Sequence, residues 1–215
     1  MQDLTIIIGN GRRSATSSAS MISVGLFALM NALVATNGNA DEIPMDDAVE
    51  AQRPFLCGRS VGNEIPSFYV RAVTGPLMNR SVCYVCRNGQ RPVVMVLMRK
   101  LNPSARDLLV EIDAIINQSR ARGLRSFGVL ISEEPMKDVS QVQTFAFDGK
   151  IEMPLTVGAP MVAMPSCQNM HPDAEVTVVL YRDRKVVANY EFLAETLDRK
   201  SIERMSIAIR RFSVE

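Results

Sequence analysis

The sequence contains no tryptophan and only four tyrosines, so it offers little aromatic surface on which a ligand could stack. Neither sign of charge is in excess, because 24 lysines and arginines stand against 23 aspartates and glutamates. A chain with balanced charge generates no broad field that attracts nucleic acid or an anionic membrane. We therefore expect no nucleic-acid partner.

The chain also lacks an apolar run of the length that spans a membrane. The apolar stretch at residues 22–35 has about 14 residues, which is short for a hydrocarbon core of roughly 30 Å. It follows Arg12 and Arg13 and precedes the small residues Gly38-Asn39-Ala40, the layout of a secretory signal. We predict that residues 1–40 are a signal peptide whose removal leaves no stable membrane span.

Two alternatives for the leader stay open. A leader that is not cleaved would anchor the protein in the membrane. Translation from Met21 in place of Met1 would remove both arginines from the leader. With cleavage, the mature protein is expected in the periplasm or outside the cell.

The remaining chain is long enough for one well-buried domain and short for two, with no internal repeat or low-complexity tract. A hydrophobic content of 47% is typical of soluble globular proteins. Residues 41–61 are largely polar and predict a flexible lead-in. The domain itself is predicted to cover residues 62–215.

Hydrophobic periodicity within this domain alternates between the strand and helix repeats. Asn102 is a candidate N-cap, followed by proline at the first helical position, and Gly123 is the expected stop. The predicted elements are a strand at 68–72, a buried strand at 93–98, a helix from 103, a strand at 126–131, a helix-like segment at 138–146, a short strand at 153–157, a hairpin at 175–181 and 186–190, and a helix at 197–212. This order predicts an α/β fold with a mixed central sheet.

All four cysteines lie in the predicted mature part, and an even number suits an oxidising compartment. Four cysteines allow three complete pairings. Proximity in sequence favours Cys83–Cys86, which leaves Cys57 and Cys167 as the residual pair.

Cys83 and Cys86 are separated by two residues, a spacing that closes a small disulfide ring or holds a soft metal. Disulfide exchange needs a thiolate that is stabilised by nearby positive charge and exposed to a partner. Arg80, Arg87 and Arg91 flank the pair and could supply that charge. The alternative is a structural disulfide that closes a loop in front of the strand at 93–98.

Two further chemistries are open at this point. Cys83, Cys86 and Cys167 with His171, the single histidine, would form an acceptable zinc ligand set if the fold brought them together. Cys167 alone could act as a peroxidatic cysteine.

Several motifs together resemble the thioredoxin-like superfamily, in particular its peroxiredoxin-related and exported branches. The matching pieces are Gly62-x-x-Ile65-Pro66-x-Phe68, the strands at 92–98 and 127–131, Met153-Pro154-Leu155-Thr156, and the hairpin around Arg182-Asp183-Arg184-Lys185. The resemblance covers residues 62–212. It implies a three-layer α/β sandwich with a mixed central sheet, and thiol–disulfide chemistry.

The sequence departs from that family at two positions. After the strand at 93–98 the family carries its reactive cysteine, whereas this chain has Arg99-Lys100-Leu101-Asn102-Pro103. Before the hairpin the family has a cis-proline, whereas Glu175-Val176-Thr177 stands here. The family's activation of a thiol at the start of that helix therefore does not carry over to Cys83 by position.

Together these observations predict an exported thioredoxin-like protein that carries out thiol–disulfide exchange or electron transfer through Cys83 and Cys86. If it is an enzyme, we expect a thiol–disulfide oxidoreductase. Cys83 is expected to be the exposed nucleophile and Cys86 the resolving cysteine, with a protein thiol or disulfide as partner and with no cofactor. The alternative is a non-catalytic binding scaffold with a structural disulfide or a Cys/His zinc site. The sequence carries no signal of an oligomeric state.

Overall fold

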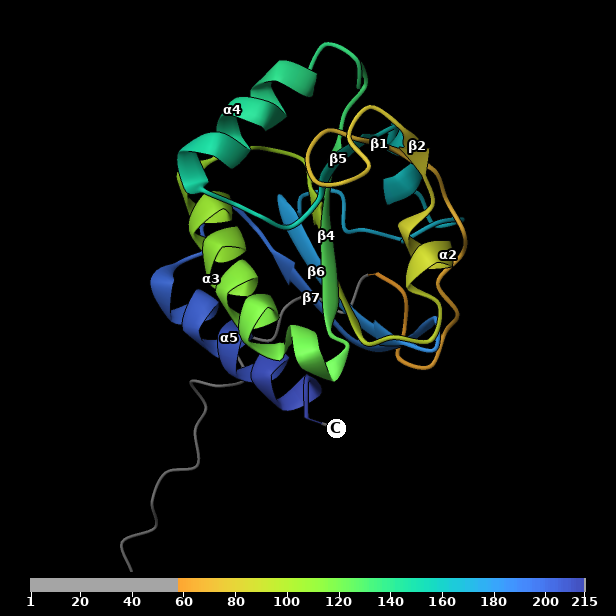
Figure 1. The fold of residues 1–215 in the computed structure, drawn as a ribbon, viewed down its shortest axis with the longest axis vertical. Helices are drawn as coiled ribbons and strands as arrows, with labels where there is room; N and C mark the ends of the chain where they lie inside the picture. Colours follow the sequence, from red (N-terminus) through yellow and green to blue (C-terminus); the bar gives the residue numbers. More distant parts are fainter. Residues whose placement is uncertain (1–57, 215) are drawn as a thin grey trace, which may run out of the picture. The chain divides into compact units, whose positions relative to one another are not determined.

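The computed structural model of the protein describes residues 58–214 (Figure 1). The predicted signal peptide, Cys57 and most of the predicted lead-in lie outside the described residues, so these expectations stay predictions. Within residues 58–214, no helix combines the length and apolar character needed to cross a bilayer.

The described residues form a seven-stranded mixed sheet in the order β2-β1-β5-β4-β3-β6-β7. Strand β3 pairs in parallel with β4 and antiparallel with β6, so it lies in the interior of the sheet. All six of its residues are buried, which confirms the predicted buried strand. The strands are β1 (Val70–Ala72), β2 (Ser81–Val82), β3 (Val93–Met98), β4 (Arg125–Ile131), β5 (Leu155–Gly158), β6 (Val176–Arg182) and β7 (Lys185–Phe192).

Helices cover the sheet unequally on its two faces (Figure 1). Because successive side chains of a strand point to opposite faces, Val94 and Val96 enter one apolar cluster and Met95 and Leu97 the other. The first cluster includes side chains of α3 (Pro103–Ser119), α4 (Val139–Gly149) and α5 (Arg199–Phe212), and the second includes side chains of the short helix α2 (Tyr84–Asn88) and the 3₁₀ turn η2 (Pro160–Ala163). The predicted three-layer α/β sandwich is confirmed.

Helix α3 begins where the sequence predicted, and the helical segment that it opens stops at the predicted Gly123 although α3 itself ends at Ser119. The Asn102 side chain accepts a hydrogen bond from the backbone N–H of Ala105 at 2.8 Å, and Pro103 occupies the first helical position. The helix runs into the 3₁₀ turn η1 (Arg120–Arg122), after which Gly123 adopts a left-handed φ of 90°. Only glycine adopts this conformation without a steric penalty, so the chain turns here into β4.

Some short elements differ from the prediction, among them β2, which was not predicted. Phe68, Val70 and Ala72 are buried as expected, but only Val70–Ala72 pairs as a strand. Helix α2 was not predicted, because five residues are too few to display a helical repeat.

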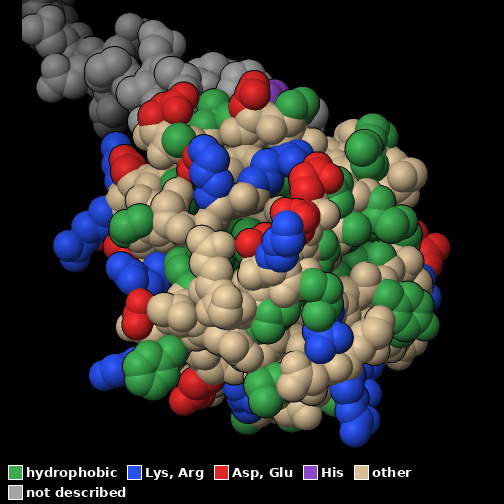
Figure 2. Space-filling model, turned by 90° about the horizontal axis from the view of Figure 1, so that it is seen from above, with side chains coloured by type: hydrophobic (Ala, Val, Ile, Leu, Met, Phe, Trp, Pro, Cys, Tyr) green, Lys and Arg blue, Asp and Glu red, His purple; other side chains and the backbone are tan. Residues whose placement is uncertain are grey.

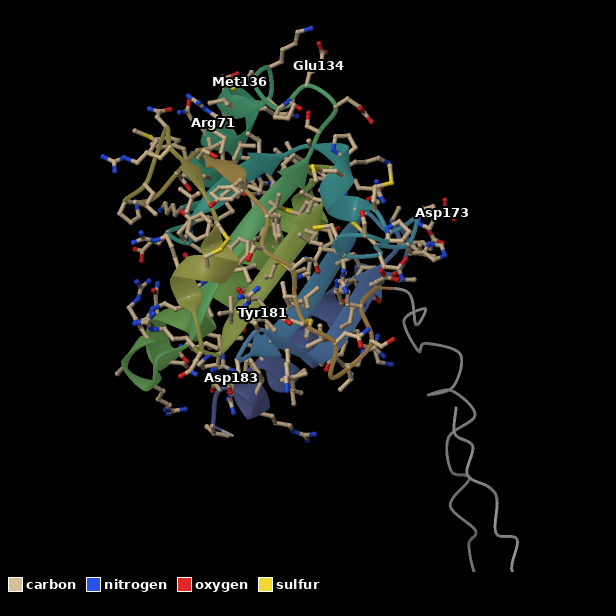
Figure 3. The ribbon with its side chains drawn as sticks, turned by 90° about the vertical axis from the view of Figure 1, so that its right-hand side faces the viewer. Arg71, Glu134, Met136, Asp173, Tyr181 and Asp183 are labelled. Atoms are coloured by element: carbon tan, nitrogen blue, oxygen red, sulfur yellow. A yellow bond between two sulfur atoms is a disulfide. The ribbon has the colours of Figure 1, made fainter. Side chains whose placement is uncertain are left out.

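The turn between β6 and β7 lies at the end of the sheet where β3 begins, because Tyr181 is the register partner of Val93. Asp183 and Arg184 form the turn with φ values of 51° and 62°. Figure 3 shows Asp183 at this end of the sheet and Asp173, which precedes β6, toward the other.

On the face seen in Figure 2, side chains of both charge signs are interspersed with hydrophobic ones. This distribution agrees with the balanced composition of the chain.

Candidate redox site

Cys83 and Cys86 form a disulfide at the start of α2, with an S–S distance of 2.07 Å and a Cα–Cα distance of 5.3 Å. Cys83 follows β2 directly and is the N-cap of α2. The backbone N–H of Cys86 donates a hydrogen bond to Cys83 Sγ at 3.1 Å. The Cys83–Cys86 pair therefore lies between a strand and a helix, as the resemblance implied. The strand is β2 and the helix is α2, whereas the resemblance implied β3 and α3.

The two sulfur-bearing residues differ in exposure. Cys83 is 5% exposed and belongs to the apolar cluster on the α2 face of the sheet, whereas Cys86 is exposed. The expectation that Cys83 is the exposed sulfur is therefore wrong for the oxidised protein. Its N-cap position directs the side chain toward the core, and Cys86 lies on the outer side of the first turn. A partner thiolate can reach Cys86 more readily than Cys83.

Aromatic packing holds α2 against the sheet. The ring of Tyr84 stacks on that of Phe127 in β4, with centroids 5.1 Å apart, and Val85 is fully buried. Burial raises the pKa of Tyr84, and the nearby charge of Arg87 opposes this shift to a smaller extent. These contacts fix the position of the disulfide without contribution from the disulfide itself.

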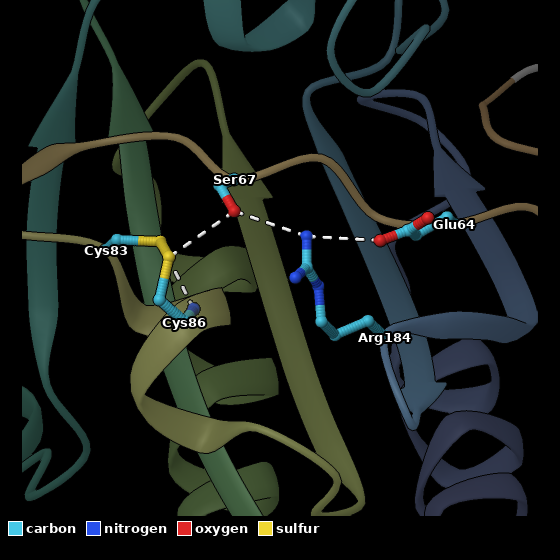
Figure 4. A network of polar contacts seen from close by, with 5 residues as sticks. All are labelled: Glu64, Ser67, Cys83, Cys86 and Arg184. Atoms are coloured by element: carbon cyan, nitrogen blue, oxygen red, sulfur yellow. Dashed lines mark hydrogen bonds and ion pairs between the residues drawn. A yellow bond between two sulfur atoms is a disulfide. The ribbon is translucent and has the colours of Figure 1, made fainter.

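A chain of polar contacts connects Cys86 to the β6–β7 turn (Figure 4). Ser67 Oγ lies 3.4 Å from Cys86 Sγ and accepts a hydrogen bond from Arg184 Nη2 at 3.2 Å. Because a disulfide sulfur carries no proton, the Ser67 hydroxyl is the donor toward Cys86. Arg184 Nη2 also lies 3.2 Å from Glu64 Oε1.

Sequence reasoning did not identify Glu64, Ser67 and Arg184 as part of the site. The sequence indicates only that Arg184 lies in a hairpin turn, whereas in the structure its side chain is 38% exposed and its Nε is buried with no hydrogen-bond partner among residues 58–214. No local signal could have found it, since it lies 98 positions beyond Cys86 and reaches the disulfide only through the hairpin. By contrast, Arg80, Arg87 and Arg91, which the sequence offered as activating cations, are all exposed.

The edge of the sheet where related folds carry their reactive cysteine has a different set of contacts here. Glu175, which precedes β6, is largely buried and pairs with Lys100 Nζ at 2.5 Å. Its other oxygen accepts a hydrogen bond from Asn102 Nδ2 at 2.9 Å. The Lys100 side chain is 68% exposed despite the ion pair. A carboxylate, an amide and an ammonium thus meet between the end of β3 and the start of β6, where the resemblance implied a thiol and a cis-proline. No peptide bond in the described part of the chain is cis.

Cys167 is buried and is not disulfide-bonded within the described residues. Burial raises the pKa of its thiol, while a hydrogen bond from Gln168 and the charge of Arg59 oppose this shift less strongly. A raised thiol pKa disfavours the thiolate that peroxidatic chemistry needs. Its pairing with Cys57 lies outside the described residues and stays a prediction.

The structure does not assemble the zinc ligands weighed from the sequence. Cys83 and Cys86 are bonded to each other, and His171 Nδ1 accepts a hydrogen bond from the backbone N–H of Asp173. In the part of the chain that the structure describes, no group of three or more histidine, cysteine, aspartate and glutamate side chains is placed to hold a metal ion.

Comparison with known proteins yields a match in structure but not in sequence. No family model matches the chain, and no curated protein matches it. A provisionally assigned protein disulfide isomerase from Bacteroides thetaiotaomicron superposes with a TM-score of 0.57 at 15% identity, covering 74% of this chain and 94% of its own. A provisionally assigned thiol:disulfide interchange protein DsbE from Chlorobium tepidum gives 0.55 at 15% identity, covering 72% and 98%.

A third structure, a mutant of PrxQ from Xylella fastidiosa, gives a TM-score of 0.51 at 12% identity and covers 71% of this chain and 96% of its own. At these identities the likeness concerns the fold. The protein has the thioredoxin-like fold, and the predicted resemblance to that superfamily is confirmed at this level.

Proposed function

We propose that the protein carries out thiol–disulfide exchange with a protein partner through Cys83 and Cys86. The observation that carries the proposal is the asymmetry of the disulfide: an exposed Cys86 sulfur is bonded to a buried Cys83 sulfur at the start of a helix, in a thioredoxin-like fold. Such a pair has one sulfur for the partner and one protected sulfur that resolves the intermediate.

In the oxidising direction, a partner thiolate attacks Cys86 Sγ. The bond between Cys86 and the partner forms, the Cys83–Cys86 bond breaks, and Cys83 leaves as a thiolate. The backbone N–H of Cys86, 3.1 Å from Cys83 Sγ in the disulfide, stabilises the negative charge on that leaving group. A second partner thiolate then attacks the partner sulfur of the mixed disulfide, so that two electrons pass from the partner dithiol to the pair, and Cys83 and Cys86 take up the two protons.

In the reducing direction the same steps run backward. The Cys86 thiolate attacks a partner disulfide and forms the mixed disulfide, releasing one partner thiolate. Cys83 then attacks Cys86 Sγ, which restores the Cys83–Cys86 bond and releases the second partner thiolate. Both directions assign first contact with the partner to Cys86 and resolution to Cys83.

The test uses a C57S/C167S background, so that the pair supplies the only thiols. Reduction of insulin disulfides with dithiothreitol as electron source is expected for the parent protein and is expected to fall to the uncatalysed rate in C86S. C83S is expected to accumulate a mixed disulfide with the partner at Cys86. Absence of insulin reduction together with a reduction potential below about −300 mV would refute the proposal, since inert structural disulfides have such potentials.

The non-catalytic scaffold is the second candidate, and one observation favours it. The edge where related folds react carries the Lys100–Glu175–Asn102 contacts and no thiol. If the protein is a non-catalytic scaffold, the disulfide serves only to stabilise α2. A C86S variant that retains every partner captured by the parent protein would support the scaffold.

We also propose that exchange takes place outside the cytoplasm, in the periplasm or after secretion. The support is the pattern of residues 1–40 in the sequence and a disulfide that an oxidising compartment would maintain. N-terminal sequencing of the protein recovered from the periplasm or medium is expected to begin at Asp41. Recovery of the chain from the cytoplasm with an intact leader would refute export.

A further inference from the structure

Arg184 occupies a backbone conformation that arginine adopts only at a cost. Its φ of 62° lies in the left-handed region, where a Cβ atom crowds the backbone and where two-residue hairpin turns usually place glycine or asparagine. A residue held in this conformation indicates a side-chain function when the side chain has specific contacts. Arg184 has such contacts, and they lead to the exposed sulfur.

The contacts of Arg184 fix its guanidinium beside the disulfide. Glu64 and Ser67 both contact Nη2 at 3.2 Å, and the backbone of the turn is held by the Ile65 N–H, which donates to the Arg184 carbonyl at 2.7 Å. The Nε atom is buried and has no hydrogen-bond partner among the described residues. A partly desolvated cation exerts a stronger field on its neighbours than one in water.

From these observations we infer that Arg184 is a positioning residue that stabilises the thiolate of reduced Cys86 through the hydroxyl of Ser67. The inference rests on the proposed exchange at Cys86 and adds the group that activates it. Ser67 accepts from Arg184 and donates to Cys86, so that the guanidinium polarises the hydroxyl in the direction that favours negative charge on sulfur. Glu64 holds the guanidinium in place through the same Nη2 atom that donates to Ser67.

The contacts from Arg184 through Ser67 to Cys86 are called the relay below. Other ionisable groups near the relay differ from Arg184 in exposure or in charge. Arg87 is exposed to water on α2, and Tyr181 in β6 is buried, so that its pKa is raised and its hydroxyl stays neutral in the ordinary pH range. Glu64 and Cys83 are bonded to members of the relay, and the charge of Arg184 acts on Tyr181. The other titratable groups next to the relay in the chain are Tyr84 and Arg87 beside Cys86, and Asp183 and Lys185 beside Arg184. Among the cations of residues 58–214, it is Arg184 that donates a hydrogen bond to Ser67.

The experiment measures the rate at which iodoacetamide alkylates Cys86 in the reduced protein as a function of pH. Fragmentation mass spectrometry separates alkylation of Cys86 from that of Cys83, which lies in the same peptide. R184Q is expected to move the midpoint of this profile upward and to slow alkylation below the midpoint about tenfold, the lower end of the effect of an opposite charge near a titrating group. R184K is expected to recover part of the rate, because it keeps the charge. A profile of R184Q that overlays that of the parent protein would overturn the inference.

Two further variants separate the relay from general effects on the turn. D183N changes the neighbouring turn residue without touching Ser67 and is expected to leave the profile unchanged; a shift as large as that of R184Q would overturn the inference. S67A is expected to move the midpoint in the same direction as R184Q. An S67A profile identical to that of the parent protein would show that no relay through Ser67 operates.

R184G is the control that separates loss of the guanidinium from loss of the fold. Glycine accepts the left-handed φ, so R184G is expected to unfold at the same urea concentration as the parent protein, or a higher one, while its Cys86 is alkylated as slowly as in R184Q. Normal alkylation in a stable R184G would overturn the inference.

The reduction potential gives an independent readout. A tenfold loss of thiolate stabilisation is expected to lower the potential of the pair by about 30 mV in R184Q, because stabilising the reduced form makes a disulfide more oxidising. An unchanged potential in R184Q would contradict the inference. If the parent protein fails to reduce insulin while R184Q still shifts the alkylation profile, the proposed function fails and the role of Arg184 stands; the converse result rejects only the role of Arg184.

Discussion

Reduction of the Cys83–Cys86 disulfide is expected to destabilise the protein only slightly. The two cysteines are three positions apart, so the disulfide closes a ring of very few residues. The loss of loop-closure entropy for so small a ring corresponds to about 2 kcal/mol, and the smallest rings give the smallest stabilisation. Thiol–disulfide exchange requires such a small destabilisation, because a pair that cycles between its oxidised and reduced states must leave the fold intact in both.

The contacts of α2 explain why the fold should survive reduction. Tyr84 stacks on Phe127 and Val85 is fully buried, and neither contact depends on the S–S bond. Cys83 is 5% exposed within the apolar cluster, and a free thiol behaves there as a small apolar side chain. We expect α2 to stay in place with its sulfurs reduced.

The assay is urea unfolding of the protein and its variants in the C57S/C167S background, where Cys83 and Cys86 are the remaining cysteines, followed by far-ultraviolet circular dichroism with and without dithiothreitol. We expect a difference of about 2 kcal/mol with an unchanged m-value, and a fall in Tm of roughly 4–8 °C. The matched control is C86S, which cannot form the ring and should unfold at the same urea concentration under both conditions. A loss above about 4 kcal/mol, or a transition that ceases to be cooperative, would refute the reasoning and identify the disulfide as a structural support of the domain.

Three further predictions follow from other contacts. E175Q removes the negative charge that Lys100 and Asn102 contact, and it is expected to lower the free energy of unfolding in urea by about 1–2 kcal/mol, because Lys100 is exposed and the Asn102 hydrogen bond is charge-assisted. Insulin reduction should not change in E175Q; a parallel loss of exchange would place the chemistry at that edge of the sheet. Hydrogen bonding from the Ser201 backbone lowers the pKa of Asp198, so the stabilising effect of this carboxylate is present above the usual aspartate pKa and is lost as the pH falls through the lower folded-state value. The urea midpoints of D198A and the parent protein should therefore differ at pH 7 and converge in strong acid. A difference that widens in acid would contradict this sign. Burial raises the pKa of Cys167, so we expect iodoacetamide to modify it only in urea-unfolded protein; rapid labelling of Cys167 in the native protein would contradict the buried position.

The fold was accessible from sequence wherever a local pattern is tied to a physical cause. A run of six apolar residues predicted β3 because an interior strand of a covered sheet buries both faces. Asn102, Pro103 and Gly123 predicted the limits of α3 and its turn because capping and left-handed φ depend on residue type. Helix α2 escaped this reasoning, since its single turn shows no period.

The candidate site was accessible only in part. The spacing of Cys83 and Cys86 predicted their disulfide, because two residues between cysteines permit ring closure. Their relative exposure was predicted the wrong way round, because it depends on which side of α2 faces the apolar cluster. That choice is made by tertiary packing and has no signature in the pair itself.

By itself, the sequence determined the order of the longer strands and helices and favoured the disulfide between Cys83 and Cys86, because both follow from short-range periodicity and spacing. The tertiary structure alone decided that Cys86 is the accessible sulfur and that Arg184 reaches it through Ser67. The physical reason is that the hairpin of β6 and β7 brings a turn residue from the far end of the chain to the Ser67 segment, and contacts of this separation arise only when the sheet is assembled.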